Sequence, residues 1–224
     1  MSRKTVFVVD DDLPVLEALT EILEAEGFLV RGFGSAEAFL DVCEARTEGC
    51  IVLDINLPGM DGLQAQEALL DRGIRLPIVF LTGHGDVPMS VRAIRAGAVD
   101  FLQKPVPAAR LVDRVHAALE LGECRRAEMD RVDAARAMLA VLTKRERDIL
   151  DQVVQGKSNK QIAADMDIST RTVEVHRRNI AQKTGVKNTL ELEKLVQLAQ
   201  ACTGICSGAT PGKCRHLLCE DVRS

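Results

Sequence analysis

The chain has 224 residues, 46% of them hydrophobic and 28% charged, and it carries a formal net charge of −4. This composition excludes a disordered or fibrous protein, and the length suits one large domain or two small ones. The longest uncharged run, 195–212, is too polar for the roughly 20 apolar residues of a membrane span, so we expect a soluble, cytoplasmic protein without membrane contact.

The first half of the chain alternates short apolar runs with amphipathic stretches of helical period. Pro14 lies where the first turn of a helix tolerates proline, and Gly27 and Gly73 follow predicted last turns. The pattern predicts strands at 5–9, 28–33, 50–53, 77–82 and 99–103, and helices at 14–26, 35–46, 62–72, 87–96 and from 107 onwards. Such alternation predicts an α/β domain with a doubly wound, five-stranded parallel sheet over 1–120.

A cluster of charged side chains is expected at the carboxyl edge of this sheet, where open α/β folds bind their ligands. The aspartates 10–12 leave the first strand, Asp54 the third, Thr82 the fourth and Lys104 the fifth. Neighbouring carboxylates repel one another and need a cation to stay ionised, and a set of oxygen ligands suits Mg²⁺. Beside that cation, Asp54 can be the nucleophile of phosphoryl transfer and form an aspartyl phosphate.

Each of these residues also has a simpler interpretation. Asp12 can cap the helix that begins near Pro14, and Lys104 can form an ordinary surface ion pair. The joint placement of all four positions favours a phosphoacceptor site over these separate roles.

The same residues carry a family resemblance. The segments 8–12, 53–62, 81–85 and 101–105 read VVDDD, LDINLPGMDG, LTGHG and FLQKP. They resemble the receiver domain of two-component response regulators, and 82–105 is especially similar to the FixJ-type subgroup. The resemblance covers 4–120 and implies a CheY-like sheet with the strand order 2-1-3-4-5.

The resemblance also implies roles for individual residues. It implies that Asp54 accepts a phosphoryl group from a cognate sensor histidine kinase. It implies a Mg²⁺ site formed by Asp10, Asp11, Asp54 and Asn56. It further implies that Thr82 is the switch hydroxyl, Phe101 the switch aromatic ring and Lys104 the amine that pairs with the phosphoryl group. A cis peptide bond is expected after Lys104.

From about residue 143 the strand pattern stops and helix starts follow one another. Helix N-caps are expected at Thr143, Ser158, Ser169 and Asn188, and the first two fit the capping-box pattern. The sequence therefore predicts an all-α domain of four short helices over 143–200. The charged, alanine-rich segment 121–142 is expected to be a helical linker that continues the fifth helix.

The predicted α domain is the basic part of the chain, with 11 Lys and Arg against 8 Asp and Glu in 143–200. A helical wheel of the third helix puts Val173 and Ile180 on one face and polar residues on the other. The polar face suits the edges of DNA bases and the phosphates beside them. The candidate DNA contacts are Lys160, Thr170, Arg171, Thr172, Glu174, Val175, Arg178 and Asn179. Taken alone, the wheel is better explained by a solvated amphipathic helix with ordinary surface charge.

A second resemblance decides between these interpretations. The segments 142–150, 156–163 and 169–176 read LTKRERDIL, GKSNKQIA and STRTVEVH. They resemble the helix-turn-helix of LuxR/NarL-type regulators, over 142–200. The resemblance implies sequence-specific binding of double-stranded DNA, a homodimer when the protein is phosphorylated, and RNA polymerase as a further partner. Together the two resemblances imply a transcriptional regulator and not an enzyme.

Two other classes of protein remain open at this point. An Asp-nucleophile phosphohydrolase usually has a second Asp two residues after the nucleophile, where this chain has Asn56. A LuxR-type regulator that senses a small molecule would need a ligand cavity in its first half.

The last segment, 201–224, belongs to neither pattern. Four cysteines and His216 lie in it, and they are potential zinc ligands without the familiar paired spacing. We expect a disordered tail in preference to a metal site.

Overall fold

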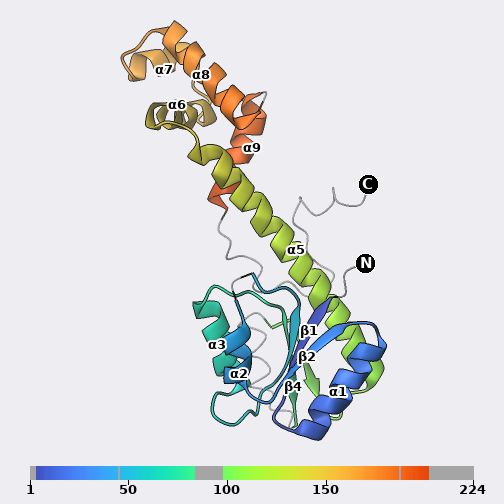
Figure 1. The fold of residues 1–224 in the computed structure, drawn as a ribbon. Helices are drawn as coiled ribbons and strands as arrows, with labels where there is room; N and C mark the ends of the chain where they lie inside the picture. The colour runs from blue at the N-terminus through green and yellow to red at the C-terminus, as the bar shows by residue number, and fades with distance from the viewer. Residues whose placement is uncertain (1–3, 45, 84–97, 187, 202–224) are drawn as a thin grey trace. The chain divides into compact units, whose positions relative to one another are not determined.

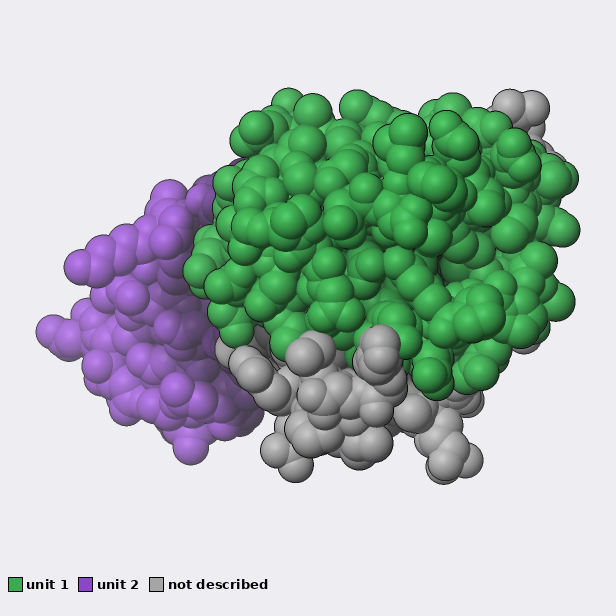
Figure 2. Space-filling model, turned by 90° about the horizontal axis from the view of Figure 1, so that it is seen from below, with its two compact units in different colours: residues 1–126, 206–224 green, residues 127–205 purple. Residues whose placement is uncertain are grey.

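The computed structural model describes residues 4–44, 46–83, 98–186 and 188–201. The described residues fall into two compact units, which meet in sequence between residues 126 and 127 and are coloured separately in Figure 2. The helix expected at 87–96 and nearly all of the tail expected at 201–224 lie outside the described residues. Among the described helices, none is both long and apolar enough to cross a membrane.

The first unit is built on one parallel sheet. Its strands are β1 (Thr5–Val9), β2 (Leu29–Phe33), β3 (Cys50–Asp54), β4 (Ile78–Thr82) and β5 (Asp100–Gln103). They lie in the order β2-β1-β3-β4-β5, which confirms the predicted fold. β3 and β4 are buried at every residue, because helices cover both faces of the central strands.

Alternate strand residues build two cores, one on each face of the sheet. The helices α2 (Ala36–Val42) and α3 (Gly62–Asp71) cover one face, where their apolar residues pack on Phe7, Leu53 and Phe80. The helices α1 (Leu13–Ala25) and α5 (Ala108–Ala140) flank the other face, where residues of both pack with Val8 and Leu81 (Figure 1).

One predicted helix is shorter than expected. The pattern predicted a helix over 35–46, but α2 ends at Val42 because the backbone of Cys43 is already extended. The amide of Glu44 then donates to the side chain of Thr47 at 2.8 Å instead of continuing the helix. A local side chain thus replaces the helical acceptor.

The second unit is all helical. It contains α6 (Lys144–Val154), α7 (Asn159–Asp165), α8 (Thr170–Thr184) and α9 (Thr189–Gln200) around a core that includes Ile149 and Ile162. The four predicted N-caps are confirmed, since each accepts a hydrogen bond from the backbone three residues later. α5 is continuous to Ala140, so the predicted linker is helical over 121–140.

Candidate functional sites

Three carboxylates meet at the carboxyl edge of the sheet. Asp10 and Asp11 follow β1, and Asp54 is the last residue of β3. Their carboxylate oxygens lie within 4.8 Å of one another. Asp10 and Asp54 are buried and Asp11 is exposed, so the cluster is closed on one side and open to solvent on the other. The predicted convergence of strand ends is therefore present.

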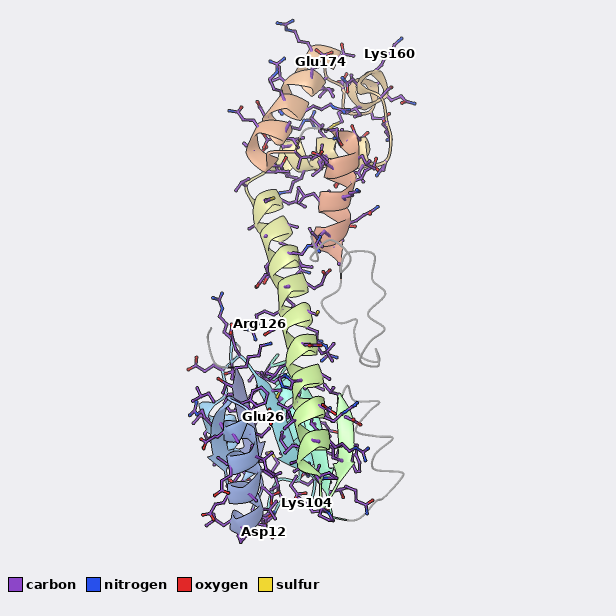
Figure 3. All side chains as sticks on the ribbon, turned by 90° about the vertical axis from the view of Figure 1, so that its right-hand side faces the viewer. Asp12, Glu26, Lys104, Arg126, Lys160 and Glu174 are labelled. Carbon is purple, nitrogen blue, oxygen red and sulfur yellow. The ribbon has the colours of Figure 1, made fainter. Side chains whose placement is uncertain are left out.

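Lys104 joins this cluster from β5. Its Nζ lies 2.5 Å from Asp10 Oδ2 and 2.5 Å from Asp54 Oδ2. Its own amide donates to the carbonyl oxygen of Thr82 at 2.7 Å, which fixes where the side chain leaves the strand. Figure 3 shows Lys104 and Asp12 at the same end of the unit, as expected for residues that follow parallel strands. Lys104 is thus part of the acidic site and not a surface ion pair.

The local electrostatics follow from burial and pairing. Burial raises the pKa of Asp10, because the charged carboxylate loses water, although the hydrogen bond from Lys104 opposes this. For Lys104, burial alone would lower the pKa, but the hydrogen bonds and charges of Asp10 and Asp54 outweigh it and raise the pKa. The amine is therefore held as a cation beside the carboxylates.

Backbone groups orient the two buried carboxylates. The amide of Asn56 donates to Asp54 Oδ1 at 3.0 Å, and the amide of Asp12 donates to Asp10 Oδ1 at 3.1 Å. Asp12 occupies the N-cap position of α1, but its side chain makes no capping hydrogen bond. Gly62 is required near Asp54, because a Cβ there would lie 2.5 Å from the Asp54 carbonyl oxygen.

The loop after β3 is held by contacts that the sequence analysis did not find. The amide of Met60 donates to Glu37 Oε1, on α2, at 3.0 Å. Asp61 and Gln64 form a capping box at the start of α3, and the Asp-x-x-Gln spacing was a readable signal for it. This loop carries Asn56, which lines one open groove together with Asp11. The loop therefore presents Asn56 beside the carboxylates.

The two predicted switch residues lie on neighbouring strands, Thr82 on β4 and Phe101 on β5. Thr82 is the last residue of β4 and is buried, one position beyond the residue that pairs with Asp54. Phe101 pairs with Phe80 in the β4–β5 register and is partly buried against the core on the α2 and α3 side. The Lys104–Pro105 peptide bond is cis, as the resemblance implies.

In the helical unit, the outward face of α8 is the one that the wheel predicted. Arg171, Glu174, Val175 and Arg178 are exposed, whereas Val173 and other apolar residues of α8 are buried. Figure 3 shows Glu174 on α8 and Lys160 on α7 at the same end of this unit. The structure also leaves three further candidates exposed or partly exposed, and these are Thr170, Thr172 and Asn179.

Several basic side chains of this unit are already bound within it. They donate to carbonyl, amide, hydroxyl or carboxylate oxygens, and they are Arg145, Arg147, Lys157, Arg177 and Lys183. A second group makes no hydrogen bond or ion pair with any residue that the structure describes, namely Lys144, Lys160, Arg171, Arg178 and Lys194. The second group includes all three of the basic residues predicted to contact DNA.

Glu146 connects the start of α6 to the end of α8. It is buried, accepts from the Thr143 amide at 2.8 Å, and accepts from Lys183 Nζ at 2.7 Å. The hydrogen bond from Lys183, with those from Thr143, lowers the pKa of Glu146 to about 2. The folded unit thus binds a proton at this carboxylate much less readily than an unfolded chain would.

We expect this pairing to make stability depend on pH. Above pH 4.5, the ordinary pKa, the ionised Glu146 stabilises the folded unit, and this contribution is lost as the pH falls towards 2. The thermal unfolding midpoint of wild type should therefore exceed that of Glu146→Gln by the largest amount at neutral pH. The difference should shrink as the pH falls from 4.5 towards 2. Thermal unfolding followed by circular dichroism measures it. Asp148→Asn, an exposed carboxylate on the same helix, should show a much smaller difference; a difference for Glu146→Gln that is constant with pH would contradict the assignment.

Comparisons with known proteins agree with both halves of this geometry. Residues 6–116 match the response regulator receiver domain, and 140–196 match the luxR family of bacterial regulatory proteins. The transcriptional regulatory protein TdiR of Thauera aromatica is 44% identical over 195 residues, which cover 87% of this chain and 86% of TdiR. The transcriptional regulatory protein FixJ of Rhizobium meliloti is 42% identical, over 90% of this chain and 97% of FixJ.

A solved structure shows the same architecture. The low-resolution structure of the response regulator StyR aligns with a TM-score of 0.77 and 43% identity, and the alignment covers 88% of this chain and 99% of StyR. The receiver match removes the two alternatives that the sequence left open, a phosphohydrolase and a sensor of small molecules. The chain therefore belongs to the two-component response regulators that combine a receiver domain with a LuxR-type DNA-binding domain.

Proposed function

We propose that a sensor histidine kinase phosphorylates this protein on Asp54, and that the phosphorylation controls its binding to double-stranded DNA and thereby transcription. The observation that carries the proposal is the contact of Lys104 with both Asp10 and Asp54 at the carboxyl edge of the sheet. It puts a fixed cation where the oxygens of a phosphoryl group on Asp54 would need one. A cytoplasmic location suits a protein with these two partners.

The carboxylate cluster fits Mg²⁺. Three carboxyl groups share this site with one lysine amine, so acidic groups outnumber the basic one, and a divalent cation would balance the excess negative charge. Asp10, Asp11, Asp54 and the carbonyl oxygen of Asn56 would hold the ion, all of them oxygen ligands. When bound, Mg²⁺ screens the charge between the carboxylates and the incoming phosphoryl group.

The chain's own residues would carry out the transfer and its readout. An Asp54 carboxylate oxygen attacks the phosphorus of the phosphohistidine, the P–N bond breaks, and Lys104 pairs with a phosphoryl oxygen. The buried hydroxyl of Thr82 then donates to the phosphoryl group, and Phe101 repacks at the end of the sheet. The changed surface favours a homodimer.

The helical unit would read the DNA. Arg171, Glu174, Val175 and Arg178 enter the major groove from the exposed face of α8, while Lys160, Thr170, Thr172 and Asn179 contact phosphates. RNA polymerase is the further partner through which the dimer would act on transcription.

The experiment that tests this function is phosphorylation of the full chain by a small phosphodonor in the presence of Mg²⁺. One phosphoryl group per chain, stable in acid and labile in base, should appear on Asp54, and binding to DNA sites selected from its genome should tighten. A chelator should prevent both. Labelling at a different residue, or tightening without labelling, would contradict the proposal.

The metal site makes a separate prediction about Asp11. Because Asp11 is the exposed carboxylate of the cluster, Asp11→Ala should weaken Mg²⁺ binding without disturbing the buried pair. The Mg²⁺ concentration that gives half-maximal phosphorylation should then be at least about tenfold higher than for wild type. Titration of the labelling rate with Mg²⁺ measures this, and an unchanged Mg²⁺ requirement would remove Asp11 from the site.

A further inference from the structure

Arg177 differs from the other arginines of α8 in how its guanidinium group is bound. Its Nη1 donates to Asn159 Oδ1 at 3.0 Å, and its Nη2 donates to Thr189 Oγ1 at 3.2 Å. Asn159 is the first residue of α7, and Thr189 is the first residue of α9. One side chain of α8 therefore connects to the starts of both neighbouring helices.

The position of Arg177 on the helix explains this arrangement. Successive residues of an α-helix are rotated by about 100°, so Arg177, four residues after Val173 and three before Ile180, leaves α8 at the edge of its buried face and nearly opposite Val175. Arg178 is exposed, whereas Arg177 is partly buried. Val173 and Ile180 fix the buried side of α8 in the core, and Arg177 adds a polar attachment at the edge of that side.

Both acceptors of Arg177 are neutral, and no carboxylate in the described part of the chain forms an ion pair with it. The two contacts therefore leave its charge uncompensated but use its planar donor geometry, which reaches two acceptors at once. Base recognition depends on that kind of geometric control, because a functional group must be held within about 0.5 Å and 10–20° of its working position.

We propose that Arg177 is a positioning residue for DNA reading. It fixes the orientation of α8 relative to α7 and α9, so that Arg171, Val175 and Arg178 meet the base edges, and it does not itself bind a phosphate. This inference rests on the proposed role of α8 as the helix that reads DNA. It separates two adjacent arginines, since Arg178 acts by contact with DNA and Arg177 acts through Asn159 and Thr189.

The test removes the acceptors and leaves every charge in place. Asn159→Ala and Thr189→Val would be made in the full chain, alone and together. Binding would be measured with Mg²⁺ and a phosphodonor at several salt concentrations, on a duplex that wild type selects from a random pool and on an unselected duplex. The double variant should lose about fivefold or more of the ratio between selected and unselected affinity, because the side chains of α8 are then held less firmly against the base edges. Affinity for the unselected duplex and the salt dependence should not change.

This ratio distinguishes positioning from a loss of folding. A partly unfolded protein loses both affinities in proportion, so the ratio stays constant. Arg177→Gln on top of the two acceptor substitutions should lower the ratio little further, because residues that act through one contact are not additive. Lys160→Gln is the matched control for charge: it should lower both affinities and reduce the salt slope by about one.

Three outcomes would contradict the assignment. If Arg177→Gln behaves like Lys160→Gln, Arg177 binds a phosphate. If the double acceptor variant keeps the wild-type ratio, Arg177 does not act through Asn159 and Thr189. If wild type selects no preferred duplex, the reading role of α8 fails and both proposals are overturned.

Discussion

Asp54→Asn should abolish phosphorylation by both a small phosphodonor and a kinase. Asparagine keeps the size of the side chain, and its one oxygen can still accept from the Asn56 amide or from Lys104, which contact different oxygens of Asp54. It lacks a carboxylate nucleophile, however, so no acyl phosphate can form. Labelling should fall below detection while the thermal unfolding of the protein stays close to that of wild type.

A matched substitution at Asp12 provides the control. Asp12→Asn also replaces an aspartate by an asparagine at the carboxyl edge of the sheet. Asp12 is exposed, makes no side-chain capping bond, and is not one of the three clustered carboxylates. Its labelling should match that of wild type. Equal labelling of Asp54→Asn and wild type would end the assignment of Asp54, whichever residue then carried the label.

The sheet and its acidic cluster could be predicted because they depend on local patterns. Buried strands such as β3 are continuous apolar runs, and the carboxyl ends of parallel strands meet at one edge whatever the details of packing. That geometry was enough to bring Asp10, Asp54 and Lys104 together. The helix caps of the second unit were equally local, since each involves two residues three positions apart.

Apart from the Asp61–Gln64 capping box, the main contacts that were not predicted join residues far apart in the sequence. Glu37 and Met60 are 23 residues apart, and Glu146 and Lys183 are 37 apart. The helical wheel separates Arg177 from its neighbour Arg178, but it does not give the partners of Arg177. Its role emerges only when α7 and α9 bring their first residues against the side of α8. Such pairs depend on how helices cross, which periodicity does not specify.

Arg178→Ala should weaken DNA binding equally in the phosphorylated and unphosphorylated protein. Its side chain is exposed on the reading face of α8 and makes no hydrogen bond or ion pair with any other described residue. Loss of a bidentate base contact costs about 1–3 kcal/mol and relaxes specificity at one base pair. Lys144→Ala removes one positive charge from α6 instead. It should lower DNA affinity less than Arg178→Ala does, and by the same amount for every duplex sequence.

Phosphorylation is expected to act differently, by promoting the pairing of two copies. Two helical units on half-sites about 10 base pairs apart put both copies of α8 on one side of the DNA and raise each other's effective concentration. Asp54 belongs to the receiver and not to the reading face, so Asp54→Asn should lose only the gain that phosphorylation gives. Titrations of a two-half-site duplex and a single half-site, with and without phosphodonor, separate these effects. If Asp54→Asn reduced basal binding as strongly as Arg178→Ala, the switch would not be separable from the reader.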